Sequence, residues 1–152
     1  MKHKETTLTL SSLEVTSQYV AALAAADTDQ MNALRSADFE LDYVYGDASQ
    51  SGPLSLEETK DFWPSWLAGF PEMDYEVTRT VAARDVVVTQ WTFTGTNSEP
   101  FGPAIFEQPF APTGRTVMFR GVSIYDIDNG LIQRETSYMD LATIMVELGV
   151  EL

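Results

Sequence analysis

The sequence contains no cysteine, and its single histidine is His3, near the amino terminus. The absence of cysteine excludes disulfides, thiol nucleophiles and cysteine-ligated metals. Because His3 lies in a stretch that we expect to be a loose tail, a serine–histidine triad, a histidine-ligated zinc and a histidine general base are nearly excluded too. Acid–base chemistry would therefore fall to aspartate, glutamate, tyrosine, Lys60 or bound water.

Basic residues are also scarce. The chain of 152 residues has 9 lysines and arginines against 23 aspartates and glutamates, and its formal net charge is −14. Proteins bind nucleic-acid phosphates through clustered lysine and arginine. No such cluster occurs here, so we expect neither nucleic acid nor an anionic membrane surface as a partner. The acidity favours solubility.

Long hydrophobic runs are missing as well. None approaches the roughly 18 residues needed to span a bilayer, and the first ten residues lack the apolar stretch of a secretory signal. We therefore expect a cytoplasmic protein with a flexible tail over residues 1–10 and a single domain over residues 11–152. Apolar residues make up 44% of the chain, which is enough for one buried core at this length.

Capping patterns predict three of the helices. Ser11 and Glu14 form a capping box, which predicts a helix that runs to about Ala26. A second cap signal over residues 27–30 predicts a short helix, and a third helix is expected from Ser55, with Pro64 kinking or breaking it. The short second helix should direct three side chains inward: Met31, Leu34 and Ala37.

The later part of the chain is expected to form mostly strands. Alternating or β-branched stretches predict strands over residues 39–43, 75–81, 86–96, 116–126 and 131–139. Asn129-Gly130 is typical of a tight hairpin between the last two strands, and a helix is expected over residues 141–148. Helices first and strands later favour an α+β fold, with helices on one face of a mostly antiparallel sheet.

One long connection is unusual. Between Thr96 and Arg115 lie four prolines and two glycines, together with large apolar residues such as Phe101. Long loops in compact domains are often lids or binding loops. The segment is interpreted either as a flap over the mouth of a pocket, or as a strand extension or dimer contact; its other large apolar residues are Ile105, Phe106 and Phe110.

Several short motifs occur in an order and spacing that resemble the SnoaL-like polyketide cyclases, a branch of the nuclear transport factor 2-like superfamily. The similarity covers roughly residues 12–150, and no single motif is specific. The matching segments are Phe62-Trp63, Phe70-Pro71, the run Trp91–Thr96, Pro100–Gly102, Pro112–Arg115, Phe119–Gly121, Tyr125, Asn129–Ile132, Asp140 and Glu147–Gly149.

This resemblance implies a cone-shaped, curved antiparallel sheet wrapped by the N-terminal helices around a pocket, often in a homodimer. It implies a small hydrophobic molecule as the partner and cofactor-free, metal-free chemistry, such as cyclisation of a polyketide. More distant relatives include ketosteroid isomerase, and others only bind or scaffold. Fold alone does not decide among these functions.

The chain departs from the family pattern at the positions that carry chemistry. On the last strand, the family's histidine, tryptophan and catalytic aspartate positions fall on Glu135, Thr136 and Ser137. Two further histidine positions fall on Asn97 and near Ser123. The resemblance therefore predicts either rewired chemistry or a binding protein without catalysis.

Glu135 is the first-choice catalytic base. It shares one face of the last strand with Ser137, and Ser123 should lie on the neighbouring strand, so the three would form a polar cluster in an apolar cone. Burial would raise the pKa of Glu135 toward neutrality, where proton transfer is efficient. The alternative is an ion pair between Glu135 and an arginine such as Arg120 or Arg134.

Two other residues are candidates for catalysis. Tyr43 falls near the position at which isomerase-like relatives place their base, and its hydroxyl could donate to an enolate-like oxygen; it could equally be a core tyrosine. Asp140 matches a family position, but it also precedes the last helix, where aspartate is a favoured N-cap.

The remaining candidates would line the pocket or belong to the core, which share one surface in a cone-shaped fold. Their aromatic character suits a flat or hydrophobic ligand. Two functions remain open: a cyclase, isomerase or hydrolase, or a non-enzymatic ligand-binding or dimerisation module. The candidate ligand-binding residues are Tyr19, Trp63, Trp66, Phe70, Trp91, Phe119, Ser123 and Ser137.

Overall fold

The computed structural model describes residues 10–44, 52–103 and 111–149, which form five helices and six strands. In chain order these elements are α1 (Ser12–Ala24), α2 (Thr28–Ala33), β1 (Arg35–Val44), β2 (Leu54–Ser55), α3 (Leu56–Thr59), α4 (Phe62–Ala68), β3 (Met73–Ala83), β4 (Val86–Thr96), β5 (Thr116–Asp128), β6 (Leu131–Met139) and α5 (Leu141–Leu148).

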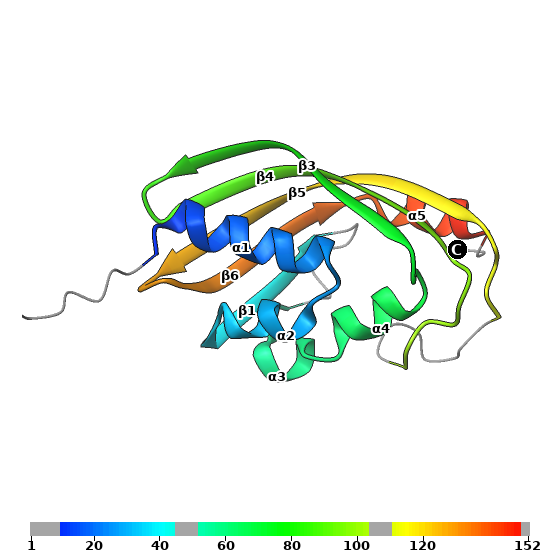
Figure 1. Cartoon of the computed structure of the whole chain (residues 1–152), viewed down its shortest axis with the longest axis horizontal. Coiled ribbons are helices and arrows are strands. Elements are labelled where there is room, and N and C mark those ends of the chain that lie inside the picture. The colour runs from blue at the N-terminus through cyan, green and yellow to red at the C-terminus, as the bar shows by residue number, and fades with distance from the viewer. Residues whose placement is uncertain (1–9, 45–51, 104–110, 150–152) are drawn as a thin grey trace, which may run out of the picture.

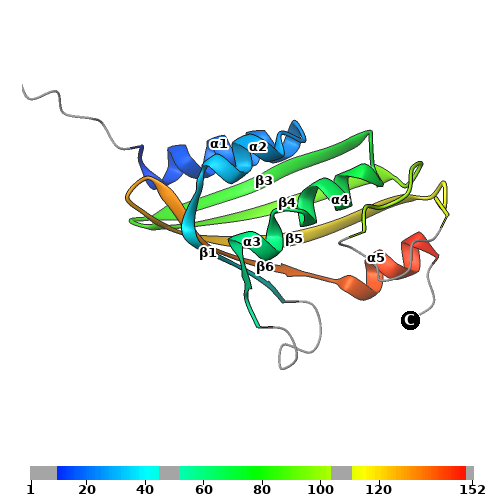
Figure 2. The ribbon, with the colours of Figure 1, turned by 90° about the horizontal axis from the view of Figure 1, so that it is seen from below.

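The six strands form one curved, open sheet in the order β2-β1-β6-β5-β4-β3. All neighbours are antiparallel except β1 and β6, which are parallel. Helices α1 to α4 lie against one face of this sheet, and α5 follows β6 at one end (Figures 1 and 2). The α+β class and the helices on one face, both expected from the sequence, are confirmed.

Helix α1 begins as the sequence predicts. The Ser11 hydroxyl accepts a hydrogen bond from the Glu14 backbone N–H, and the Glu14 carboxylate accepts one from the Ser11 N–H. These reciprocal bonds satisfy two N–H groups that have no partner within the helix. The helix ends at Ala24 and buries Tyr19 among its inward-facing residues.

The first strand is longer than its sequence pattern indicated. It begins at Arg35, directly after α2, and Arg35 is paired with Ile132 of β6. Ala37, predicted to face inward from a helix, lies instead on β1 and is exposed. That prediction was wrong because pairing with a distant strand overrides the local helical preference of this segment.

The predicted break in the third helix is present, but Pro64 does not cause it directly. Helix α3 ends at Thr59 and α4 starts at Phe62, so Pro64 is the third residue of α4. The first turn of a helix tolerates proline, because its N–H groups lack helical partners. Pro64 therefore marks the start of α4.

The β5–β6 hairpin places the last strand. Asn129 and Gly130 both have positive φ, at 52° and 75°, as a two-residue type I′ turn requires. Next to the turn, Asp126 pairs with Arg134 while Ile127 pairs with Ile132, which leaves one extra residue on β6. This β-bulge shifts the side-chain alternation by one position, so the residue after Arg134, rather than Arg134 itself, faces inward.

Part of the long connection after β4 is described. Phe101 is buried and stacks on Trp66, with ring centroids 5.3 Å apart. Asn97 is fully buried and its side chain bonds Gly69, Glu99 and Thr113, so it ties the two ends of the connection together. The other apolar residues of the predicted flap lie outside the described residues: Ile105, Phe106 and Phe110.

No helix among the described residues is both long and apolar enough to cross a membrane.

Candidate functional site

Glu135 projects from β6 into the interior of the domain. Its side chain is 2% exposed, and its Oε2 atom has no hydrogen-bond partner of standard geometry among the described residues. A buried carboxylate is costly unless it is paired or protonated. Glu135 is thus a buried carboxyl without a salt-bridge partner among the described residues.

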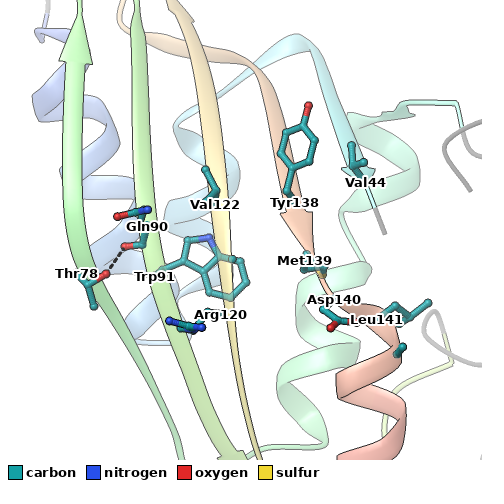
Figure 3. Close-up of a pocket in the computed structure, with 12 residues that line it drawn as sticks. Val44, Thr78, Gln90, Trp91, Arg120, Val122, Tyr138, Met139, Asp140 and Leu141 are labelled. Atoms are coloured by element: carbon teal, nitrogen blue, oxygen red, sulfur yellow. Dashed lines mark hydrogen bonds between the residues drawn. The ribbon is translucent and has the colours of Figure 1, made fainter. Parts of the chain in front are cut away.

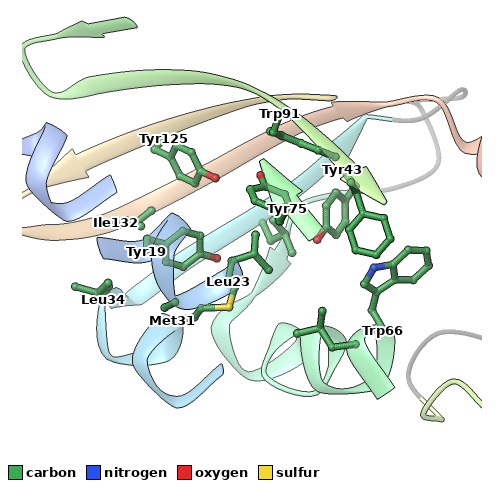
Figure 4. Close-up of a cluster of buried hydrophobic side chains, with 14 of the residues drawn as sticks. Tyr19, Leu23, Met31, Leu34, Tyr43, Trp66, Tyr75, Trp91, Tyr125 and Ile132 are labelled. Carbon is green, nitrogen blue, oxygen red and sulfur yellow. The ribbon is translucent and has the colours of Figure 1, made fainter. Parts of the chain in front are cut away.

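Four tyrosines surround this carboxyl from different elements. Tyr125 of β5 stands directly opposite Glu135 in the sheet, and Tyr43 and Tyr75 project from β1 and β3. Tyr19 comes from α1, and its ring meets that of Tyr125 edge to face at 5.6 Å. Figure 4 shows their hydroxyl groups directed into the same interior.

The pKa values in this cluster favour neutral side chains. Burial raises the pKa of Glu135 from 4.5 to about 7, although the positive charge of Arg35 and the hydroxyls of Tyr125 and Tyr19 lower it in part. Burial and the negative charge of Glu135 raise the pKa of Tyr43 well above 10. At neutral pH Glu135 is thus divided between its charged and neutral forms, while Tyr43 remains a proton donor.

Arg35 is the cation whose charge lowers the pKa of Glu135, and the sequence pattern did not predict this role. Its Nη2 and Nε atoms donate to the Tyr19 hydroxyl at 2.6 and 3.2 Å, and its Nη1 donates to Asn32 at 3.2 Å. Its guanidinium lies 4.4 Å from the ring centroid of Phe39. None of the ion pairs between described residues involves Glu135.

The ion pair proposed as the alternative for Glu135 is not formed with either expected arginine. Arg134 donates to Glu40 and Asp42, both at 2.9 Å, on the other face of the sheet. Arg120 is exposed on that same outer face. The bulge in β6 turns Arg134 outward and Glu135 inward, so these two side chains lie on opposite faces of the sheet.

A second polar group lies beside Glu135, as the sequence predicted. The hydroxyls of Ser123 and Ser137 are 2.7 Å apart across β5 and β6, and the Trp91 indole N–H donates to Ser123 at 2.8 Å. Both serines are buried. The structure therefore brings together Glu135 and the two serines that the family alignment had placed on neighbouring strands.

A cavity of about 340 Å³ lies between the sheet and the helices α4 and α5. This volume is at the small end of the range for ligand pockets, which is roughly 300–1,000 Å³. Its wall is mainly aromatic and contains all three tryptophans of the chain. The lining residues are Tyr43, Leu54, Phe62, Trp63, Trp66, Tyr75, Trp91, Phe93, Phe119, Met139, Leu141, Ile144 and Met145.

Five of the predicted ligand contacts and catalytic residues line this cavity: Tyr43, Trp63, Trp66, Trp91 and Phe119. Phe70 does not. It is 1% exposed and packs against Trp66 and Phe93, with ring centroids 4.9 and 5.1 Å away. Phe70 therefore belongs to the hydrophobic core and not to the wall of this cavity.

Tyr19, Ser123, Ser137 and Glu135 are also absent from the cavity wall and lie deeper. Tyr43 and Tyr75 connect the cavity with the deeper cluster around Glu135. Both line the cavity, and the negative charge of Glu135 raises the pKa of both.

A second hollow, of about 890 Å³, lies on the outer face of the sheet (Figure 3). It is open and contains side chains such as Tyr138 and Arg120, and Asp140 stands at its edge. Asp140 is the N-cap of α5: its carboxylate accepts from the Thr143 N–H at 3.1 Å and from the Thr143 hydroxyl at 2.7 Å. These bonds lower the pKa of Asp140 and give it the capping role that its position before the helix predicted.

Sequence reasoning missed three members of the site. Tyr125 could have been found, because it is two residues beyond Ser123 and alternation puts both on one face. Tyr75 likewise begins an alternating stretch. Arg35 carried no such signal, since its neighbours suggested a helix. Among the described residues, no group of three or more histidines, cysteines, aspartates or glutamates could hold a metal ion.

Comparisons with known proteins agree with this architecture. AclR of Streptomyces galilaeus, a proposed hydroxylase, superposes with a TM-score of 0.75 at 20% identity, over 91% of this chain and 95% of its own. A proposed SnoaL-like polyketide cyclase from Jannaschia sp. CCS1 gives 0.75 at 18% identity, over 99% and 100%. IdmH of Streptomyces antibioticus, a proposed polyketide cyclase, gives 0.71 at 23% identity, over 91% and 99%.

At these identities the structural matches show a common fold alone. A comparison with curated protein sequences finds no significant match. The family model of the SnoaL-like polyketide cyclases matches residues 14–148. With this match over most of its length, the chain belongs to the SnoaL-like polyketide cyclase family.

Proposed function

We propose that this protein catalyses proton transfer beside the carbonyl group of a small hydrophobic molecule, without a cofactor, and that Glu135 is the base. The observation that carries the proposal is the buried Glu135 carboxyl, with an Oε2 atom that has no standard hydrogen-bond partner among the described residues. Its pKa of about 7 is close to neutral pH, at which a general base is partly in its proton-accepting form and still binds the proton strongly. Cyclisation, isomerisation and hydrolysis could each follow from such a step.

Tyr43 and Tyr75 are the proposed hydrogen-bond donors. Both line the cavity, and burial keeps both protonated at neutral pH. A donor aimed at the carbonyl oxygen stabilises the negative charge that develops when the adjacent proton is removed. Because Glu135 lies behind the cavity wall, the polar end of the ligand has to insert between these two tyrosines to reach it.

The cavity favours a compact, flat and uncharged ligand. Its aromatic wall provides apolar faces for a ring system, and its volume of about 340 Å³, at the small end of the range for ligand pockets, favours compact molecules. An anionic ligand group would be repelled by Glu135 in its charged form. We therefore propose small aromatic or alicyclic ketones as the substrate class.

The proposal is tested by proton exchange at carbon. Small aromatic ketones such as 2-tetralone are incubated with the protein in D₂O, and loss of the signal of the hydrogens beside the carbonyl is followed by ¹H NMR. General-base catalysis contributes about 10²–10⁴-fold, so Glu135→Gln should slow the exchange by about that factor. Equal rates for the wild type and Glu135→Gln would contradict the assignment of Glu135.

A second candidate function is a ligand-binding module without catalysis. The observation that favours it is that Glu135 is outside the wall of the cavity. This function predicts that 2-tetralone quenches tryptophan fluorescence equally in the wild type and in Glu135→Gln, while neither protein accelerates exchange.

We also propose a homodimer that forms through the outer face of the sheet. Support comes from large exposed hydrophobic side chains there, among them Met118 at 59% and Tyr138 at 47% exposure. Sedimentation at micromolar concentration should show a dimer, and Met118→Glu should shift it to monomer. A monomeric wild-type protein would contradict this assembly. The cytoplasmic location stays an expectation from the sequence.

A further inference from the structure

We propose that Arg35 is a positioning residue that holds the Tyr19 hydroxyl so that its proton is directed toward Glu135, and that this pair decides when Glu135 is charged. The inference rests on the proposed role of Glu135 as a base. It adds two residues of the first helix and first strand, neither of which lines the cavity, to the machinery of the site.

The hydrogen bonds around Tyr19 determine the direction of its proton. The Tyr19 oxygen accepts two hydrogen bonds from Arg35, at 2.6 Å from Nη2 and at 3.2 Å from Nε. The Trp63 indole N–H also lies near this oxygen, without a bond of standard geometry. A phenol has one proton to donate. Because donors occupy this oxygen, its proton is left for an acceptor. The Tyr19 ring meets the Tyr125 ring edge to face, and Tyr125 is paired with Glu135 across the sheet, which brings the Glu135 carboxyl near Tyr19. No bond of standard geometry joins the two, but the Tyr19 hydroxyl lowers the pKa of Glu135.

The remaining contacts of Arg35 keep it in this position. Its Nη1 donates to Asn32, and the guanidinium lies over the Phe39 ring. The side chain is 5% exposed, so it has little freedom to turn toward Glu135 and form a direct ion pair. Arg35 therefore acts on Glu135 in two ways: its positive charge attracts the carboxylate through space, and its hydrogen bonds orient the Tyr19 hydroxyl.

The other groups that face Glu135 are neutral. They are Tyr43 from β1, Tyr75 from β3 and Tyr125 from β5, and burial raises the pKa of each. Arg35 is the charged residue that lowers the pKa of Glu135, while burial acts in the opposite direction. Without Arg35 and Tyr19 the pKa of Glu135 would be higher, so less of the carboxyl would be charged and able to accept a proton at neutral pH.

The test measures the protonation of Glu135 directly and requires no substrate. The protein is labelled with ¹³C at the glutamate side-chain carboxyl and titrated by NMR, and the Glu135 signal is assigned by its loss in Glu135→Gln. Tyr19→Phe removes one oxygen and keeps the ring. Tyr138→Phe, which removes an exposed hydroxyl from the outer face of the same strand as Glu135, is the matched control.

Tyr19→Phe and Arg35→Met should each raise the pKa of Glu135 by about half a unit or more, which is well outside titration error. The double variant should show no more than the larger single shift, because both changes break one chain of contacts. Arg35→Lys should also raise it, because lysine keeps the charge but lacks the two-donor fork. Tyr138→Phe should leave it unchanged.

An unchanged Glu135 pKa in folded Tyr19→Phe would overturn the proposal. A Glu135 pKa in Arg35→Lys equal to that of the wild type would also overturn it, because it would show that the charge alone acts. A merely structural role for Arg35 would lower the melting temperature without moving the titration. These outcomes are independent of the exchange experiment, so the proposed function can fail while the Arg35–Tyr19 effect stands, and the reverse.

Discussion

The Oγ atoms of Ser123 and Ser137 lie 2.7 Å apart, joining β5 to β6 inside the domain. The Trp91 indole N–H donates to Ser123, and the two serine hydroxyls share a further hydrogen bond, so the three side chains form one chain of bonds. The two hydroxyls thus hold Trp91, which is part of the cavity wall, against the sheet.

The two serines should differ in their effect on stability. Ser137→Ala removes one hydrogen bond and should lower the free energy of unfolding by about 1 kcal/mol. Ser123→Ala should cost more, about 1–3 kcal/mol, because it also leaves the buried Trp91 N–H without its acceptor. Urea denaturation followed by fluorescence measures both. A larger loss for Ser137→Ala would contradict the central place of Ser123 between Trp91 and Ser137.

Glu135 should make stability depend on pH. Its pKa rises from 4.5 to about 7 on folding, so the folded state binds the proton more tightly. The stabilisation is therefore fully present below about pH 4.5 and is lost as pH rises to about 7. At about 1.4 kcal/mol per unit, the loss is on the order of 3 kcal/mol.

Glu135→Gln, which imitates the protonated side chain, should abolish this loss and be more stable than the wild type above pH 7. The measurement is the free energy of unfolding in urea between pH 4.5 and 8. Glu76→Gln, at an exposed position of β3, changes the net charge equally and should keep the pH dependence of the wild type. Parallel curves for wild type and Glu135→Gln would show that Glu135 titrates normally.

Gly121 makes room for Trp91 on the sheet. A Cβ atom at this position would meet the Trp91 ring, so Gly121→Ala should displace the indole from Ser123 and change the cavity wall. Overpacking of this kind typically costs about 1–3 kcal/mol. Denaturation and the tryptophan emission maximum report both effects. Gly52→Ala, where nothing lies within 4 Å, is the control, and equal effects in the two variants would contradict the argument.

Asp140 should matter for α5 and not for chemistry. Asp140→Ala should lower the melting temperature by a few degrees through loss of the cap, while Asp140→Asn, also a good N-cap, should stay close to the wild type. Both should keep the exchange activity toward 2-tetralone. A loss of exchange in Asp140→Asn, with stability intact, would return Asp140 to the list of catalytic candidates.

Local sequence patterns predicted much of the fold. The capping box at Ser11, the turn at Asn129-Gly130 and the final helix formed as predicted, because caps and tight turns depend on residues three or four apart. The error at Ala37 has the opposite origin. Its segment pairs with β6, almost a hundred residues later in the chain, and local propensity contains no information about that partner.

The sequence by itself limited the candidates for acid–base chemistry: without cysteine, and with one histidine near the amino terminus, it left aspartate, glutamate, tyrosine, Lys60 and bound water. Only the tertiary structure decided which of them meet. The bulge in β6 turns Glu135 inward, and the order of the strands brings Tyr125 and Ser123 beside it. Arg35 reaches the cluster through Tyr19. The physical reason is that burial and hydrogen-bond partners are properties of the packed sheet, and its register depends on contacts between residues far apart in the chain.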